Sequence, residues 1–103
     1  MNIQKMMKQA QKMQAELARA QEELGTRQVE ATVGGGKVTV VATGTGDVLS
    51  IKIAKEVVDP EDVEFLEDLV LSGVKQAIAK GKEMTQDEMG KLSAGMGLPP
   101  GLM

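Results

Sequence analysis

Residues 28–53 have the sequence QVEATVGGGKVTVVATGTGDVLSIKI, in which three runs of alternating apolar and polar residues are separated by two glycine-rich segments. Alternation with a period of two is typical of β-strands that bury one face. Residues 34–36 and 44–47 contain the Gly and Asp that tight hairpin turns favour. The sequence therefore predicts a three-stranded antiparallel meander.

The alternation places nine apolar residues on one face of this sheet, with Val41 and Val48 as exceptions. The nine are Val29, Ala31, Val33, Val38, Val40, Ala42, Leu49, Ile51 and Ile53. Such a sheet needs a cover on that face, and its two outer strands have open edges that a short meander cannot hide. We therefore expect long helices to cover the sheet and a partner chain to protect it.

Residues 2–24 lack Pro and Gly and predict a long helix that Gly25 ends. Seven apolar residues recur at alternating spacings of three and four: Ile3, Met6, Ala10, Met13, Leu17, Ala20 and Leu24. This heptad seam favours packing against another helix or a second chain. A helix of this length spans roughly 34 Å and a six-residue strand only about 20 Å, so part of the helix must overhang the sheet.

Residues 59–62, Asp-Pro-Glu-Asp, indicate the start of a second helix, with Asp59 as the N-cap. Its apolar stripe contains Val63, Leu66, Val70, Val74, Ala77, Gly81 and Met84. Residues 93–103 are rich in Gly, Pro and Met and predict a flexible tail. The predicted fold is α+β: one α-β-β-β-α domain over residues 1–92, in which two long helices cover one face of the meander.

The chain of 103 residues contains neither Cys nor His, which removes thiol ligands, the usual general base and the usual metal ligand. No nucleophile stands beside a base, and the acidic residues near the second helix are explained by helix capping. We therefore expect a protein that is not an enzyme, with no cofactor, metal site or small-molecule substrate. No apolar run has the length of a membrane span or signal peptide, so we expect no membrane partner and a cytoplasmic location.

The net charge of −3 conceals a strong segregation of charge, because seven acids and no base lie between Glu56 and Asp68. Two other segments, residues 1–15 and 69–82, carry three bases each and no acid. The candidate DNA-binding residues are seven basic residues of the two predicted helices: Lys5, Lys8, Lys12, Arg19, Lys75, Lys80 and Lys82. The first four residues of this list follow one another at spacings of three, four and seven and form one stripe on the first helix. A solvated helix face is the alternative interpretation of this stripe.

The residue types also limit the kind of nucleic-acid binding. Lysines suit phosphate contact, whereas only Arg19 and Arg27 could read guanine edges by paired hydrogen bonds. Phe65 is the only aromatic residue, which argues against single-strand binding by base stacking. Neither glycine-rich segment precedes a helix, so a phosphate-binding loop is not expected. These residue types favour contact with the phosphate backbone over reading of the base edges.

Several motifs resemble those of the YbaB/EbfC family of bacterial nucleoid-associated DNA-binding proteins, and together they cover nearly the whole chain. They are KQAQKMQ at residues 8–14, the three glycines at 34–36 with Val38, GTGDV at 44–48, LEDLV at 66–70 and GMGLPPG at 95–101. The resemblance implies an α-β-β-β-α protomer, a homodimer whose helical arms resemble tweezers, and DNA binding with little sequence preference.

We favour the hypothesis of a homodimeric, nucleoid-associated protein that binds double-stranded DNA through lysine-rich arms, organises it and influences gene expression. The alternative is a protein-interaction adaptor that uses the heptad seam of residues 3–24 and does not bind DNA directly. An enzyme is the third and least favoured class.

Overall fold

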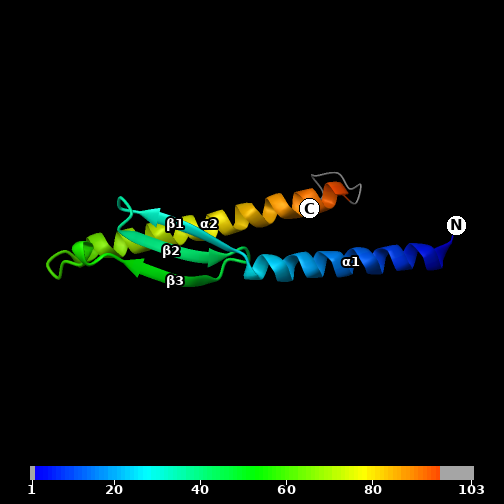
Figure 1. Cartoon of the computed structure of the whole chain (residues 1–103), viewed down its shortest axis with the longest axis horizontal. Helices are drawn as coiled ribbons and strands as arrows, with labels where there is room; N and C mark the ends of the chain where they lie inside the picture. Colours follow the sequence, from blue (N-terminus) through cyan, green and yellow to red (C-terminus); the bar gives the residue numbers. More distant parts are fainter. Residues whose placement is uncertain (1, 96–103) are drawn as a thin grey trace.

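The computed structural model describes residues 2–95, in which a helix, three strands and a second helix follow one another (Figure 1). The elements are α1 (Ile3–Thr26), β1 (Gln28–Val33), β2 (Val38–Thr43), β3 (Val48–Ile53), the short 3-10 helix η1 (Lys55–Val57) and α2 (Val63–Gly95). The predicted α+β class and α-β-β-β-α order are confirmed. The tail predicted from residue 93 differs, since α2 continues to Gly95, and residues 96–103 lie outside the described part.

The three strands form an antiparallel sheet in the order β1-β2-β3, as the glycine-rich turns predict. Gly34, Gly35, Gly36 and Gly46 have φ angles of 63°, 69°, 87° and 91°, a region that residues with a side chain rarely adopt. The two connections are therefore turns between strands.

A β-bulge in β3 corrects the predicted placement of Leu49. Val41 pairs with Ser50, but Ala42 pairs with Val48, so Leu49 is an extra residue without a partner in β2. Cross-strand partners share a face of the sheet, and Val48 therefore takes the position beside Ala42 that was predicted for Leu49. Strict alternation along β3 ends at this point.

Helix α2 lies along β1 and β2 and reaches β3 much less (Figure 1). Its glycines allow this close approach: a Cβ atom on Gly73 would lie 2.9 Å from Val40 Cγ2 and 3.5 Å from Val33 Cγ2. The fully buried core consists of small and β-branched residues, Ala31, Val38, Val40, Ala42 and Ala77. Because α2 packs on β1 and β2, the same face of β3 is left uncovered.

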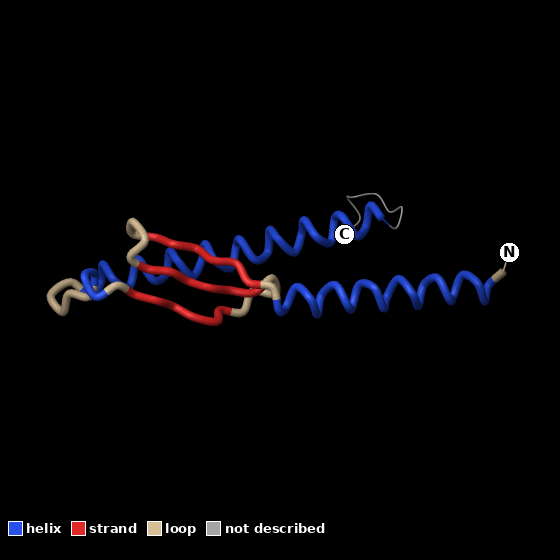
Figure 2. Tube along the Cα trace, in the orientation of Figure 1, coloured by secondary structure: helices blue, strands red, loops and turns tan. Residues whose placement is uncertain are grey.

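Helix α1 projects from the end of the sheet and joins it through its C-terminal turn (Figure 2). Only Leu24, near its C-terminal end, is fully buried, with 3% of its surface exposed. The Asn2 side chain caps the free end by accepting a hydrogen bond from the backbone nitrogen of Lys5 at 3.2 Å. The sequence predicted that both helices cover the sheet with part of α1 overhanging; in the structure α2 alone is the cover and nearly all of α1 overhangs.

The acidic segment before α2 has a structural role, although its N-cap lies three residues later than predicted. The Asp62 carboxylate accepts a hydrogen bond from the backbone nitrogen of Phe65 at 3.3 Å, which identifies Asp62 as the cap. Asp59 instead closes the preceding turn by accepting a hydrogen bond from the backbone nitrogen of Glu61 at 3.0 Å.

Neither long helix, over its described residues, has an apolar stretch sufficient to cross a membrane.

Candidate nucleic-acid interface

Both long helices project beyond the same end of the sheet, so one protomer presents two helical arms (Figure 1). Helix α2 leaves the sheet at Gly81, which packs directly against the backbone carbonyl of Thr43 at the end of β2. We call residues 3–23 the α1 arm and residues 82–95 the α2 arm. At 1.5 Å per residue the α1 arm is about 30 Å long and the α2 arm about 20 Å.

The basic residues of α1 form one exposed stripe. Lys5, Lys8, Lys12 and Arg19 are all exposed, and at 100° per residue they fall within about 60° of one another around the helix. The centre of this stripe lies about 140° from the centre of the heptad seam. Among residues 2–95, the ion pairs are Arg27–Glu88, Lys37–Glu56 and Lys91–Glu88, and none involves this stripe. Its charges are therefore free to contact an anionic partner.

The heptad seam is covered only near the root of the α1 arm. Met13 and Leu17 are half-buried, whereas Ile3 and Met6 are 69% and 52% exposed and Ala10 is also exposed. Among residues 2–95, the seam thus has a partner where α1 meets α2 and none toward its tip. The structure of one chain leaves the predicted role of this seam in dimer or helix packing as a prediction.

The three candidate lysines of α2 differ in their surroundings. Lys75 and Lys82 are exposed and lie on the side of α2 that faces away from the sheet, given their positions relative to buried Ala77. Lys80 lies at the flank of the helix, where its ammonium group donates a hydrogen bond to the carbonyl oxygen of Glu30 at 2.9 Å. The ammonium group of Lys80 therefore helps to hold α2 against β1.

Within one protomer Lys12 and Lys75 lie in opposite directions from the end of the sheet. Lys12 lies about 18 Å along α1 from Leu24 at the end of the sheet, while Lys75 lies about 9 Å from Gly81 in the opposite direction. The α2 arm itself is mixed in charge, with two lysines and three acids: Lys82, Lys91, Glu83, Asp87 and Glu88. The α1 arm is thus the more basic of the two.

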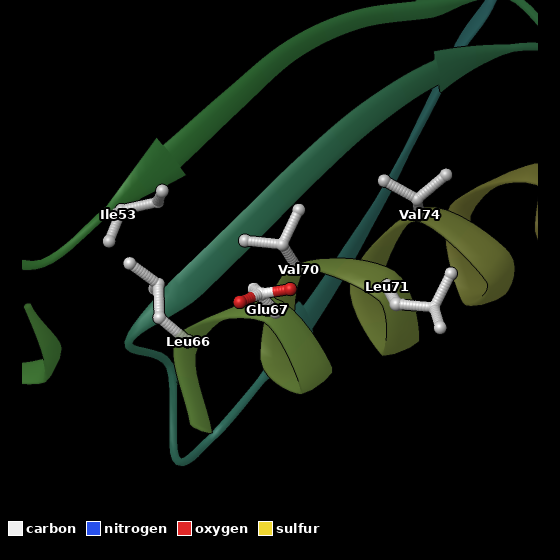
Figure 3. A pocket seen from close by; sticks show the side chains of 6 residues that line it. All are labelled: Ile53, Leu66, Glu67, Val70, Leu71 and Val74. Atoms are coloured by element: carbon white, nitrogen blue, oxygen red, sulfur yellow. The ribbon is translucent and has the colours of Figure 1, made fainter. Parts of the chain in front are cut away.

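An apolar groove lies at the other end of the molecule. The sequence placed most of its lining residues on apolar faces, but it did not predict the groove. The groove has a volume of about 430 Å³ and is lined by Ile53, Leu66, Glu67, Val70, Leu71 and Val74. Figure 3 shows that β3 contributes Ile53 and α2 contributes the rest, so the groove lies between the last residue of β3 and the first half of α2. The open strand edges were the signal in the sequence, but only the position of α2 shows which side is affected.

Comparison with known proteins shows the family of this chain. Residues 1–96 match the model of the YbaB/EbfC DNA-binding family. The chain belongs to the YbaB/EbfC DNA-binding family. It is 51% identical over 98 residues to a nucleoid-associated protein of Pelotomaculum thermopropionicum, covering 95% of this chain and 93% of the relative. A nucleoid-associated protein of Acetivibrio thermocellus is 54% identical over 101 residues, covering 98% and 89% of the two chains.

A solved structure also shares the fold of this YbaB/EbfC chain. The crystal structure of an uncharacterized protein from Helicobacter pylori superimposes with a TM-score of 0.67, covering 93% of this chain and 97% of that one at 21% identity. Membership of a DNA-binding family favours the DNA-binding hypothesis over the adaptor hypothesis and places the chain in no class of enzymes.

Proposed function

We propose that this protein is a homodimeric, nucleoid-associated protein that binds double-stranded DNA with little sequence preference through the lysine stripe of the α1 arm. The observation that carries the proposal is the exposed stripe of Lys5, Lys8 and Lys12 on a helix that stands clear of the sheet. Family membership and the names of the relatives support DNA as the partner and the cytoplasmic nucleoid as the location.

The stripe suits the phosphate backbone better than the base edges. Lysine carries a compact charge with freely rotating donors, and each ammonium group that neutralises a phosphate releases a condensed counterion. Backbone contacts of this kind fix position without reading sequence. Lys75 and Lys82 add positive charge on the outer side of α2, and Lys80 and Arg19 supplement the two groups. The protein would organise DNA, and influence gene expression, by occupying many sites.

A second copy of the chain is the proposed occupant of the uncovered surface of β3 and α2. All six residues of β3 are exposed, and Leu49, Ile51 and Ile53 remain 52%, 42% and 40% accessible. Monomeric proteins rarely expose contiguous apolar patches of more than a few hundred Å². The patch contains a strand edge, which a two-fold axis can match with itself.

The accessible surface area of the single chain is larger than that of a compact monomer, which supports a partner chain. The chain exposes 7439 Å², whereas a compact protein of 10.9 kDa exposes about 5,600 Å². The projecting arms and the exposed residues of β3 contribute to this area, and a stable interface buries about 800 Å² on each partner. Since the groove lies at the end opposite the arms, a dimer formed there leaves both pairs of arms accessible (Figures 1 and 3).

Equilibrium titration of random-sequence duplexes tests this function. Lys8→Glu should weaken binding at least about tenfold, because two copies of the reversed charge would repel phosphates in each dimer. Lys55→Glu is the matched control, since Lys55 is also exposed but lies in η1, at the end of the sheet away from the arms. Equal loss of affinity in the two variants would contradict a binding site on the α1 arm.

A further inference from the structure

A single residue, Gly44, forms hydrogen bonds with the segment that follows the α1 arm and with the first turn of the α2 arm. Its backbone nitrogen donates to the carbonyl oxygens of Leu24 at 3.0 Å and Arg27 at 3.2 Å, where α1 ends and β1 begins. Its own carbonyl oxygen accepts a hydrogen bond from the hydroxyl of Thr85, in the first turn of the α2 arm. One buried residue of the β2–β3 connection therefore joins α1 to α2.

The connection that carries Gly44 is itself held in shape by Thr43. This residue is 3% exposed, and its hydroxyl oxygen accepts hydrogen bonds from the backbone nitrogens of Thr45 at 3.3 Å and Asp47 at 3.2 Å. The backbone nitrogen of Thr43 in turn donates to the Asp47 carbonyl at 2.9 Å. Gly44 is thus presented by a closed turn.

The junction has no spare room. A Cβ atom on Gly44 would lie 2.7 Å from the carbonyl oxygen of Leu24 and 2.9 Å from both Met84 Cε and the Thr85 hydroxyl oxygen. Gly44 is not among the glycines with positive φ, so its backbone conformation would accept alanine. Crowding between the two arms is the reason for glycine at this position.

An ion pair braces the same region one turn farther along the α2 arm. The Arg27 guanidinium lies 3.2 Å from the Glu88 carboxylate, and Lys91 lies 3.7 Å from the same oxygen. Because Arg27 is about half exposed, this pair is a weak constraint by itself. The buried Gly44 contacts carry the main restraint.

We propose that the junction of Leu24, Gly44 and Thr85 fixes the angle between the α1 and α2 arms, and that Gly44 and Thr85 are positioning residues for DNA binding. The second half of this proposal rests on the proposed function. An arm held at a fixed angle presents its lysines already arranged, so less conformational freedom is lost when they bind phosphates. Neither positioning residue needs to touch DNA.

The distance between two spin labels tests the junction directly. The chain has no cysteine, so Gln9→Cys on the α1 arm and Ala94→Cys on the α2 arm, both exposed positions, give a uniquely labelled parent. Dilution with unlabelled chain restricts pulsed electron paramagnetic resonance to distances within one protomer. We expect one narrow distance distribution in the parent and a shifted or broadened one in Thr85→Val, which keeps the shape of the side chain and loses the hydroxyl.

Two variants serve as matched controls, and a second substitution perturbs the junction independently. Thr85→Ser retains the hydroxyl and should restore the distribution of the parent. Gly44→Ala should displace an arm, whereas Gly90→Ala makes the same change on the α2 arm where no other atom lies within 4 Å, and should leave the distance unchanged. A distribution in Thr85→Val identical to that of the parent would overturn the proposal.

Duplex titration of the same proteins separates positioning from binding. Thr85→Val should bind about fivefold more weakly, with the same dependence on salt as the parent, because the same lysines still meet phosphates. An altered distance with unaltered affinity would overturn the positioning role. A parent that does not bind duplexes would contradict the proposed function, while an altered distance in Thr85→Val would still support the junction.

Discussion

The ammonium nitrogen of Lys80 lies 2.9 Å from the carbonyl oxygen of Glu30, so a lysine of α2 supports the backbone of edge strand β1. This contact divides the basic residues of the protein into two kinds. Lys80 stabilises the packing of helix on sheet, whereas Lys5, Lys8 and Lys12 stand on an arm with no such contact among the described residues.

The division predicts different effects for one substitution at two positions. Lys80→Met retains the apolar stem and should lower the free energy of unfolding by less than about 1 kcal/mol, since the lost hydrogen bond is exposed to solvent. Its effect on duplex affinity should be smaller than that of Lys8→Met. Urea unfolding and fluorescence anisotropy measure the two quantities, and equal losses of affinity would show that Lys80 contacts DNA as strongly as Lys8.

The close contact of Gly73 with Val40 predicts that alanine destabilises a helix position where it is normally favourable. Alanine in place of glycine inside a helix stabilises by about 1 kcal/mol. At residue 73 the added Cβ would lie 2.9 Å from Val40 Cγ2, so Gly73→Ala should lower stability instead.

A double-mutant cycle checks that explanation. Val40 is completely buried, and Val40→Ala alone should cost about 2 kcal/mol. In the double variant Gly73→Ala/Val40→Ala the new methyl group occupies vacated space, so its loss should be clearly less than the sum of the single losses. Additive losses, measured by chemical unfolding, would show that the two side chains do not compete for space.

The uncovered surface of β3 and α2 predicts the effect of a charge on assembly. Leu71 lines the groove and is 53% exposed, so Leu71→Lys should leave the protomer folded and dissociate the dimer. Val58 is also 53% exposed and does not line the groove, which makes Val58→Lys the matched control. Sedimentation equilibrium measures the mass; a Leu71→Lys protein that remains dimeric would place the interface elsewhere.

The sheet was predictable because its signals are local. Alternation gives the strand faces and glycine gives the turns, so the three strands were found almost to the residue. The bulge at Leu49 was not predictable, because alternation along one strand does not reveal which residue of the neighbouring strand each residue pairs with. The sequence predicted Asp59 in place of Asp62 as the N-cap, because two aspartates three residues apart both suit the start of a helix.

The arrangement of helices on the sheet depended on contacts distant in sequence. The seam of α1 was visible in its spacing, but the direction of α1 is decided where Leu24 meets Gly44, twenty residues later. Likewise, the small residues of α2 let it pack closely on β1 and β2, and this packing leaves the groove beside β3. The basic stripe was predictable as a pattern on one helix; its position relative to the lysines of α2 required the fold.

The dependence of duplex affinity on salt tests the central claim most directly. If about six lysines of a dimer neutralise phosphates, the logarithm of the association constant should fall against the logarithm of salt concentration with a slope of about −5. Lys12→Gln, which removes one charge from each α1 arm, should reduce that slope by about 2. A flat salt response of the unaltered protein would contradict binding through the lysine arms.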